Sequence, residues 1–282
     1  MEISTLLKNF EFELRGNRFR ENSVENYISC AKIFLEKFKS KDSLKHINEQ
    51  EIKEFLYSFK EHNTQRAYHS AIKSLFKYVA KQPNKFRFIK YCKKKQKLPI
   101  VLSVEEMQKL IFAAENLKHK TIICLMYSTG MRVGEVINLK IENIDSSRMI
   151  INIIDAKGGK DRQVTLDPTL LKLLRLYFTQ YRPVDYLFNG QSSPQYSERS
   201  IAQFIQKYAD LAGLKKRVYP HLIRHNYATH LHEAGADLSI IQKLLGHSSI
   251  KTTQIYSHIS NNHISKIVTP LQFILDENKK IA

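Results

Sequence analysis

The stretch PHLIRHNYATHLHEAGADLSIIQKLLGHSSIKTTQIYSH, residues 220–258, is the part of this sequence on which the interpretation of the whole chain depends. Pro220 is a residue favoured at the first position of a helix. His221 and Arg224 follow three residues apart, so their side chains would share one helix face. The start of the stretch therefore predicts a helix that presents an imidazole and a guanidinium together.

Two more polar residues follow on the next predicted helices. The run LSIIQKLL, residues 238–245, is amphipathic and precedes Gly246, which is suited to a helix C-cap. His247 would lie at that helix end, and Tyr256 would lie on the helix after it. Two imidazoles, a guanidinium and a phenol on consecutive short helices form a candidate site for phosphate chemistry.

The charge of the chain indicates a polyanionic partner. The 282 residues include 45 Lys and Arg against 27 Asp and Glu, a net charge of +18 with His neutral. Such a field favours nucleic acid first and an anionic membrane surface second. No apolar run approaches the ~20 residues that span a bilayer, and the N-terminus does not resemble a signal peptide. Three scattered cysteines fit a reducing cytosol, so we expect a cytoplasmic, nucleoid-associated protein.

The first part of the chain predicts a small all-α domain, which we place at residues 1–84. Capping-box spacings mark expected helix starts at Asn22 with Glu25 and at Asn48 with Glu51. A basic linker, residues 85–100, follows. Its run KFRFIKYCKKKQK holds seven Lys and Arg and no acidic residue. It is either a solvated linker or a DNA-facing connector. The second interpretation assigns phosphate contacts to Lys90, Lys93, Lys94 and Lys95.

The second domain, residues 101–282, is predicted to be mainly α-helical. It begins with a capping-box spacing between Ser103 and Glu106. The run STGMRVGEVINL then places Arg132 at a turn between two glycines, and Glu135 follows one helical turn later. A lone arginine in such a loop is usually a surface residue, so this signal alone is weak.

A β-hairpin is predicted within that second domain. Two β-rich runs, residues 149–154 and 163–166, flank the sequence DAKGGKDR, whose glycine pair suits the tip of a hairpin. Lys157 and Lys160 would project from this hairpin. Taken alone, each is more typical of a solvated turn lysine than of a catalytic one.

Together these motifs resemble the catalytic pattern of the tyrosine recombinases, the phage integrase family that includes the Xer proteins. The resemblance covers residues 103–258 through TGMRVGE, AKGGKDR, HLIRH, LGH and a tyrosine nine residues beyond the LGH histidine. Residues 1–84 resemble the core-binding domain of that family. The resemblance implies a catalytic set of Arg132, Lys157, His221, Arg224, His247 and Tyr256, with Lys160 as a further DNA-binding residue.

Each residue type in this set suits phosphodiester cleavage without a metal. Arg132 and Arg224 can clamp the phosphate, which gains negative charge in the transition state. Tyr256 would be the nucleophile and form a 3′-phosphotyrosyl link. Its unperturbed pKa of ~10 means that it needs help to lose its proton.

The other members of the set would move protons or orient groups. His221 is the expected base, and Lys157 the expected acid for the leaving 5′ oxygen. His247 would donate to a phosphate oxygen, and Glu135 would orient rather than react. His221 and His225 share a spacing seen in zinc sites, but no glutamate or cysteine pair accompanies them, so we expect no metal and no cofactor.

The resemblance also implies an architecture and an assembly. The expected fold is mainly α with a small β-hairpin or sheet: an all-α, SAM-like N-terminal core-binding domain and an α+β catalytic domain that form a C-shaped DNA clamp. The expected partner is double-stranded DNA with a specific recombination site. Four copies, or copies of this chain with a related paralogue, would exchange strands through a Holliday junction. The amphipathic tail, residues 263–282, would contact the neighbouring subunit.

Two other functions are left open by the sequence. One is a DNA-binding protein of the same fold that has lost catalysis, and intact catalytic residues argue against it. The other is a nicking-closing enzyme similar to type IB topoisomerases, which shares the chemistry but does not pair sites. Among recombinases, the sequence does not separate dimer resolution from integration and excision.

Overall fold

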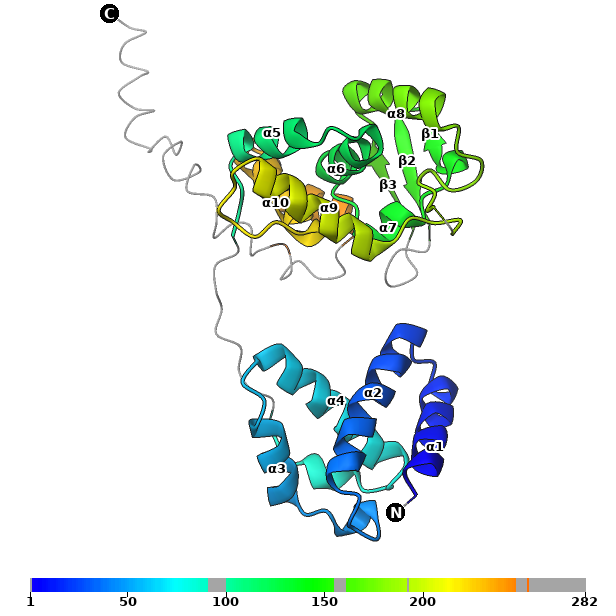
Figure 1. Ribbon diagram of the computed structural model, residues 1–282, viewed down its shortest axis with the longest axis vertical. Helices are drawn as coiled ribbons and strands as arrows, with labels where there is room; N and C mark the ends of the chain where they lie inside the picture. The colour runs from blue at the N-terminus through cyan, green and yellow to red at the C-terminus, as the bar shows by residue number, and fades with distance from the viewer. Residues whose placement is uncertain (1, 91–99, 155–160, 192, 247–252, 254–282) are drawn as a thin grey trace, which may run out of the picture. The chain divides into compact units, whose positions relative to one another are not determined.

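A computed structural model describes residues 2–90, 100–154, 161–191, 193–246 and 253 (Figure 1). The chain divides into two compact units, Met1–Lys97 and Leu98–Ala282. The linker lysines Lys93, Lys94 and Lys95 lie outside the described residues, as does the tail, residues 263–282. Each unit has a hydrophobic core of its own.

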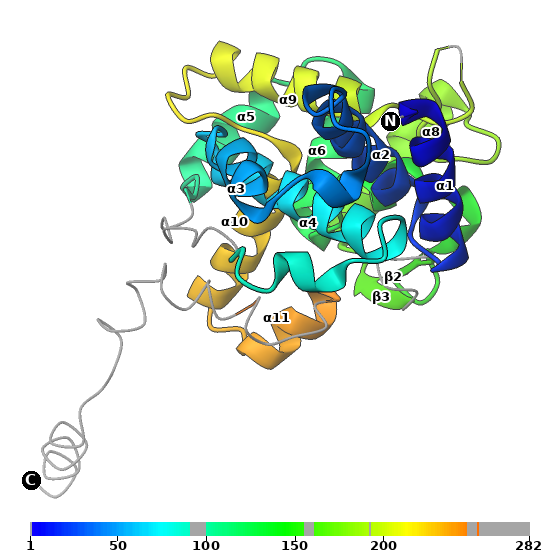
Figure 2. The ribbon, with the colours of Figure 1, turned by 90° about the horizontal axis from the view of Figure 1, so that it is seen from below.

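The first unit is all α-helical among its described residues. Its elements are α1 (Ile3–Gly16), α2 (Glu21–Lys37), η1 (Leu44–His46), α3 (Glu49–Tyr57), α4 (His62–Tyr78) and η2 (Pro83–Phe86). Figure 2 shows the four α-helices from a second side. Its core contains Phe34, whose ring packs edge-on against Phe55 and Phe76 at centroid distances of 5.2 and 6.2 Å.

One of the two helix starts predicted in this unit is correct. Asn48 Oδ1 accepts from the Glu51 amide at 2.9 Å, and Glu51 Oε2 accepts from the Asn48 amide at 2.8 Å, which is a complete capping box at the start of α3. The start predicted at Asn22 is wrong. α2 begins at Glu21, because the carbonyl of Arg20 already accepts from the amides of residues 23 and 24.

The second unit combines helices with one small sheet. Its elements are α5 (Val104–Ala113), α6 (Leu117–Thr129), α7 (Val133–Ile137), η3 (Ile141–Asn143), β1 (Ile144–Asp145), β2 (Ile150–Ile153), β3 (Arg162–Thr165), α8 (Pro168–Tyr181), α9 (Glu198–Leu211), α10 (Pro220–Glu233) and α11 (Leu238–Leu245). The sheet is antiparallel in the order β1-β2-β3, and Ile151 pairs with Val164. The predicted hairpin is β2 with β3.

The core of the second unit is built around α6. Ile122, Ile123, Leu125 and Met126 are fully buried, and α8 and α10 both pack against this helix (Figure 1). The predicted capping box at the start of α5 is present, since Ser103 and Glu106 exchange two hydrogen bonds. Among the helices that the structure describes, none has both the length and the apolar character to cross a bilayer.

A close approach of α10 to α6 depends on a glycine. Gly130 ends α6 with φ of 63°, a left-handed conformation that an amino acid with a side chain rarely adopts. A Cβ atom at this position would lie 2.4 Å from Cδ1 of Tyr227 on α10 and 2.9 Å from Cδ2 of Leu245 on α11. The missing side chain therefore lets α10 and α11 pack directly on the end of α6.

Candidate active site

Arg224 is buried at the place where three helices meet. It lies on α10 with 1% of its surface exposed. Its Nη1 donates to the Gly130 carbonyl and its Nη2 to the Leu245 carbonyl, both at 2.6 Å. One guanidinium thus joins the C-terminal ends of α6 and α11, whose last carbonyls have no partner within their own helices.

Arg132 occupies the loop between α6 and α7. It is the N-cap of α7, and its amide donates to Glu135 Oε2 at 2.8 Å. Its side chain returns to the same carboxylate, with Nη1 2.7 Å from Oε1. The Arg132 side chain is 24% exposed, whereas that of Glu135 is 6% exposed. Glu135 therefore contacts Arg132 through both its backbone amide and its partly exposed guanidinium.

A third arginine, Arg162, completes the cluster and was not among the predicted site residues. It is the first residue of β3, and its Nη1 and Nη2 donate to Oε1 and Oε2 of Glu135 at 2.8 and 2.7 Å. Its Nε donates to the Leu244 carbonyl at 2.9 Å. The sequence signal that could have identified Arg162 is the alternation of inward and outward side chains along a strand, because Arg162 shares the inward face of β3 with Val164. A buried arginine needs an anionic partner.

The electrostatics of this cluster favour a bound anion. Burial opposes the charge of Glu135, but the guanidiniums of Arg162 and Arg132 outweigh burial and lower the pKa of this carboxylate to about 2. The guanidinium of Arg224 is also near, with Nη1 3.9 Å from Oε2. Three positive groups around one negative group leave a local excess of two positive charges.

We expect Glu135 to make acid stability depend on this cluster. Its pKa is depressed from 4.5 to about 2 in the folded protein, so its contribution is fully present above pH 4.5 and is lost as the pH falls toward 2. A shift of this size corresponds to roughly 3 kcal/mol in the free energy of unfolding.

The comparison that tests this expectation is wild type against Glu135→Gln. The stability advantage of the wild type should shrink by roughly 2 kcal/mol between about pH 7 and about pH 3. Urea titrations of the full chain, read by hydrogen exchange in peptides of the second unit, measure this difference. An advantage that does not change with pH would contradict the assigned pKa.

Two histidines on α10 lie beside Arg224. The rings of His221 and His225 meet edge to face with centroids 4.5 Å apart. His221 is exposed and His225 is half-buried. Burial, with the nearby His221 and Arg224, lowers the pKa of His225 to about 4, so this ring is neutral at physiological pH. His225 can therefore donate or accept hydrogen bonds beside the cluster without adding charge.

Of the remaining predicted site residues, Lys90 is described and the others lie outside the described residues. Lys90 is exposed and follows Ile89, whose carbonyl lies 2.8 Å from His69 Nε2 in the first unit. Outside the described residues are Lys157, Lys160, His247 and Tyr256. The described chain ends α11 at the left-handed C-cap Gly246, with φ of 64°, immediately before His247. The structure thus brings Arg132, Glu135 and Arg224 together and adds Arg162.

The described residues near this cluster do not form a metal-binding site. Among the residues that the structure describes, no group of three or more His, Cys, Asp or Glu side chains is placed to bind a metal ion. In the pair with zinc-like spacing, burial and the positive charges of His221 and Arg224 lower the pKa of His225.

Comparison with known proteins identifies the family of this chain. Residues 101–263 match the phage integrase family, and residues 6–85 match the N-terminal SAM-like domain of phage integrases. A tyrosine recombinase of Pseudothermotoga lettingae is 32% identical over 272 residues, which cover 91% of this chain and 94% of that protein. Tyrosine recombinase XerA of Pyrococcus horikoshii is 35% identical over 208 residues, 72% of each protein.

A solved structure has the same fold. The XerH site-specific recombinase, in a pre-cleavage complex with its difH substrate, superposes with a TM-score of 0.73 at 26% identity, covering 94% of this chain and 84% of that one. These comparisons identify an enzyme that cleaves and rejoins DNA, a site-specific tyrosine recombinase. The chain belongs to the phage integrase family and is Xer-like.

This assignment confirms several predictions made from the sequence. The family, the mainly α fold with a small antiparallel sheet and the reaction class are all as expected. The comparisons give no support to a silent DNA-binding protein or to a nicking-closing enzyme.

Proposed function

We propose that Arg132 and Arg224 hold the scissile phosphate of a DNA strand while Tyr256 attacks it. The observation that carries this proposal is the convergence of three guanidiniums on the single buried carboxylate of Glu135. A site with this excess of fixed positive charge stabilises the charge that a phosphodiester gains in its transition state.

The proposed reaction conserves the energy of the broken bond. The Tyr256 hydroxyl oxygen forms a bond to phosphorus as the bond from phosphorus to the 5′ oxygen breaks, leaving a 3′-phosphotyrosyl ester and a 5′-hydroxyl. His221 accepts the phenol proton, Lys157 supplies a proton to the 5′ oxygen, and His247 donates to a phosphate oxygen. Attack by a 5′-hydroxyl on the ester reverses these steps and rejoins the strand. No metal or cofactor takes part.

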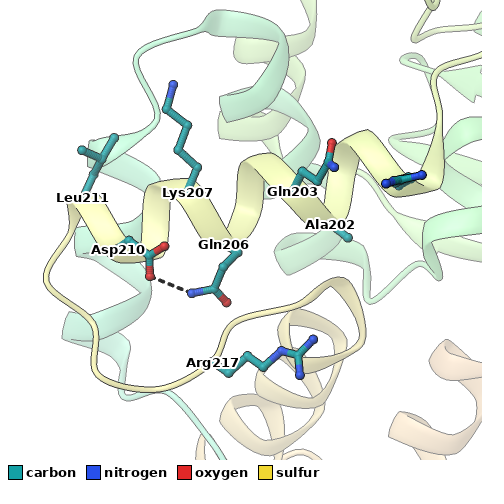
Figure 3. Close-up of a pocket in the computed structure, with 8 residues that line it drawn as sticks. Ala202, Gln203, Gln206, Lys207, Asp210, Leu211 and Arg217 are labelled. Atoms are coloured by element: carbon teal, nitrogen blue, oxygen red, sulfur yellow. Dashed lines mark hydrogen bonds between the residues drawn. The ribbon is translucent and has the colours of Figure 1, made fainter.

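The DNA that this enzyme binds is proposed to lie partly against α9. The helix is amphipathic, with Ile201 and Ile205 fully buried and Arg199, Gln203 and Lys207 exposed at intervals of four residues. Figure 3 shows an open hollow along this exposed face, into which the loop before α10 brings Arg217. Asp210, the one acid that lines the hollow, accepts a hydrogen bond from Gln206 at 2.7 Å.

Removing charge from this face is expected to weaken DNA binding in a salt-dependent way. Arg199 and Lys207 are eight residues apart, about 12 Å along the helix, and suit two phosphates of one backbone. Arg199→Ala combined with Lys207→Ala should make the slope of log K against log salt about 2 units less negative. Fluorescence anisotropy with duplex DNA at several salt concentrations measures this slope.

A matched control distinguishes an effect of the α9 face from an effect of removing positive charge elsewhere on the same unit. Lys172 and Arg175 are exposed on α8 of the same unit. Lys172→Ala combined with Arg175→Ala removes the same charge and is expected to leave the slope within about 0.5 of the wild type. Equal changes in both double variants would contradict the α9 surface.

The two units, the linker and the C-terminal tail have proposed roles in an assembly. We propose that the first unit and the basic linker, residues 85–100, bind the duplex together with the second unit. Lys90, Lys93, Lys94, Lys95 and Lys160 would contact phosphates. Four copies would act on two specific recombination sites through a Holliday junction, each passing residues 263–282 to its neighbour. The expected location is the cytoplasmic nucleoid.

The experiment that tests the proposed function traps the covalent intermediate. A library of nicked duplexes is incubated with the wild-type protein in the presence of a chelator. The nick lets the short 5′-hydroxyl fragment diffuse away, so rejoining cannot occur and the adduct accumulates. A protein–DNA adduct with a released 5′-hydroxyl is the expected result, whereas strand breaks without an adduct, or a requirement for metal, would overturn it.

A further inference from the structure

We propose that Arg162 is a positioning residue for strand cleavage, holding Glu135 and the end of α11 in the arrangement that the reaction needs. This inference rests on the cleavage site proposed above. The sequence motifs gave this residue no role, and its hydrogen bonds go to Glu135 and to the Leu244 carbonyl. Its action would therefore be exerted through Arg132 on one side and through the segment that follows α11 on the other.

The contacts of Arg162 join three segments that are distant in the sequence. Its fork of two nitrogens matches both oxygens of Glu135, 27 residues earlier. Its third nitrogen, Nε, reaches the carbonyl of Leu244, 82 residues later. A lysine could supply the charge but not this planar set of donors. The side chain is 7% exposed, so water competes little for these bonds.

The same side chain packs against the end of α11. A Cβ atom on Gly246 would lie 3.0 Å from Cδ of Arg162, so the left-handed C-cap lies directly on the arginine stem. His247 is the next residue in the sequence. Arg162 therefore fixes the last described turn before the segment that carries His247 and Tyr256.

Arg162 also affects how Glu135 interacts with Arg132 and Arg224. Three guanidiniums face this carboxylate, from Arg132 before α7, Arg162 on β3 and Arg224 on α10. Tyr227 on α10 is near Arg162 and Arg224 and is itself half-buried, which raises its phenol pKa and keeps it neutral. Without Arg162, the buried carboxylate would be balanced only by Arg132 and the more distant Arg224. It would then compete with the DNA phosphate for both.

The test compares single-turnover cleavage by Arg162 variants on a nicked duplex that the wild type cleaves. Arg162→Met is expected to slow adduct formation about 10²-fold while the DNA dissociation constant stays within about twofold, because misplacing a catalytic group by ~1 Å has effects of this size. Arg148→Met is the matched control. That arginine lies in the turn between β1 and β2 with its side chain 76% exposed, and its replacement should leave the rate unchanged.

A pH profile separates positioning from a general loss of structure. In the wild type, Glu135 stays ionised down to very low pH. In Arg162→Met its main balancing partner is gone while its burial persists, so its pKa should rise. Protonation of the carboxylate ends its competition with the DNA phosphate for Arg132 and Arg224. The ratio of the wild-type rate to the variant rate should therefore shrink as the pH falls below the raised pKa, whereas a general loss of structure would not make it shrink.

A double variant tests whether Arg162 acts through Glu135. If it does, Glu135→Gln combined with Arg162→Met should be no more than about twofold slower than Arg162→Met alone. Fully multiplicative effects of the two changes would overturn the proposal. If Arg162→Met does not fold, Arg162→Lys decides: we expect a folded protein, slowed about tenfold at neutral pH, whose defect relative to the wild type shrinks as the pH falls. A wild-type rate and profile in Arg162→Lys would overturn the positioning role.

These outcomes distinguish the inference from the function on which it rests. If the wild type forms no adduct on any nicked duplex, the proposed cleavage site is wrong. If the wild type forms a Tyr256 adduct and both Arg162 variants match its rate and pH profile, the cleavage site stands and only the positioning role fails.

Discussion

Tyr256→Phe should abolish the covalent adduct on nicked DNA, with a loss of roughly 10⁴-fold or more in the cleavage rate. Phenylalanine keeps the ring and removes the single oxygen that would bond to phosphorus. DNA affinity should change less than about twofold, because a phenol that reacts with the phosphate contributes little to binding the duplex. Gel analysis of the denatured adduct measures cleavage, and anisotropy measures affinity.

A second tyrosine controls for the substitution itself. Tyr219 is the N-cap residue of α10 and is 42% exposed, and Tyr219→Phe should form the adduct at the wild-type rate. If Tyr256→Phe still forms an adduct, the nucleophile is another residue, which peptide mapping of the adduct would identify. If neither the wild type nor Tyr219→Phe reacts on any duplex, the proposed reaction itself is contradicted.

Arg224→Ala should damage both the reaction and the fold. Its guanidinium is the donor for the Gly130 and Leu245 carbonyls, so truncation leaves two buried acceptors without it. Each unsatisfied group costs about 1–3 kcal/mol, and we expect the free energy of unfolding to fall by roughly 2–5 kcal/mol. Loss of a preorganised positive group at the phosphate should slow cleavage at least ~10³-fold.

The conservative variant separates these two effects. Arg224→Lys keeps the charge, but a single ammonium cannot reproduce the bridge between the ends of α6 and α11. It should recover more than half of the lost stability while cleavage stays at least ~10²-fold slow. Arg175→Ala, an exposed arginine on α8, should change neither quantity. Wild-type cleavage by a folded Arg224→Lys would contradict a clamping role for this guanidinium.

Local chemistry allowed much of the fold to be predicted. Asn48 with Glu51, and Ser103 with Glu106, begin helices because a side chain and an amide only three residues apart satisfy each other whatever lies elsewhere. The hairpin of β2 and β3 follows equally from a glycine pair in the sequence between two β-rich runs. The Asn22 prediction failed because the carbonyl of Arg20 had already begun the helix.

The candidate site, like the fold, could be predicted from the sequence only in part. The resemblance of short motifs to those of the tyrosine recombinases pointed to Arg132, Glu135 and Arg224. The sequence also contains the three arginines and the glutamate of the cluster, within a strongly basic chain. It did not show which of its many arginines would be buried or which partners they would have.

Only the tertiary structure decided those partners. Arg224 bonds to a carbonyl 94 residues away, and Arg162 bonds to one that is 82 residues away. Such contacts form when α11 meets β3 and when α10 packs on α6 and α11, and no local spacing encodes those contacts. Because a buried guanidinium is stable only where packing supplies acceptors for it, the fold selected Arg162 from among the basic residues of the hairpin region. The sequence determined the chemical groups, and the packing of distant segments determined their arrangement.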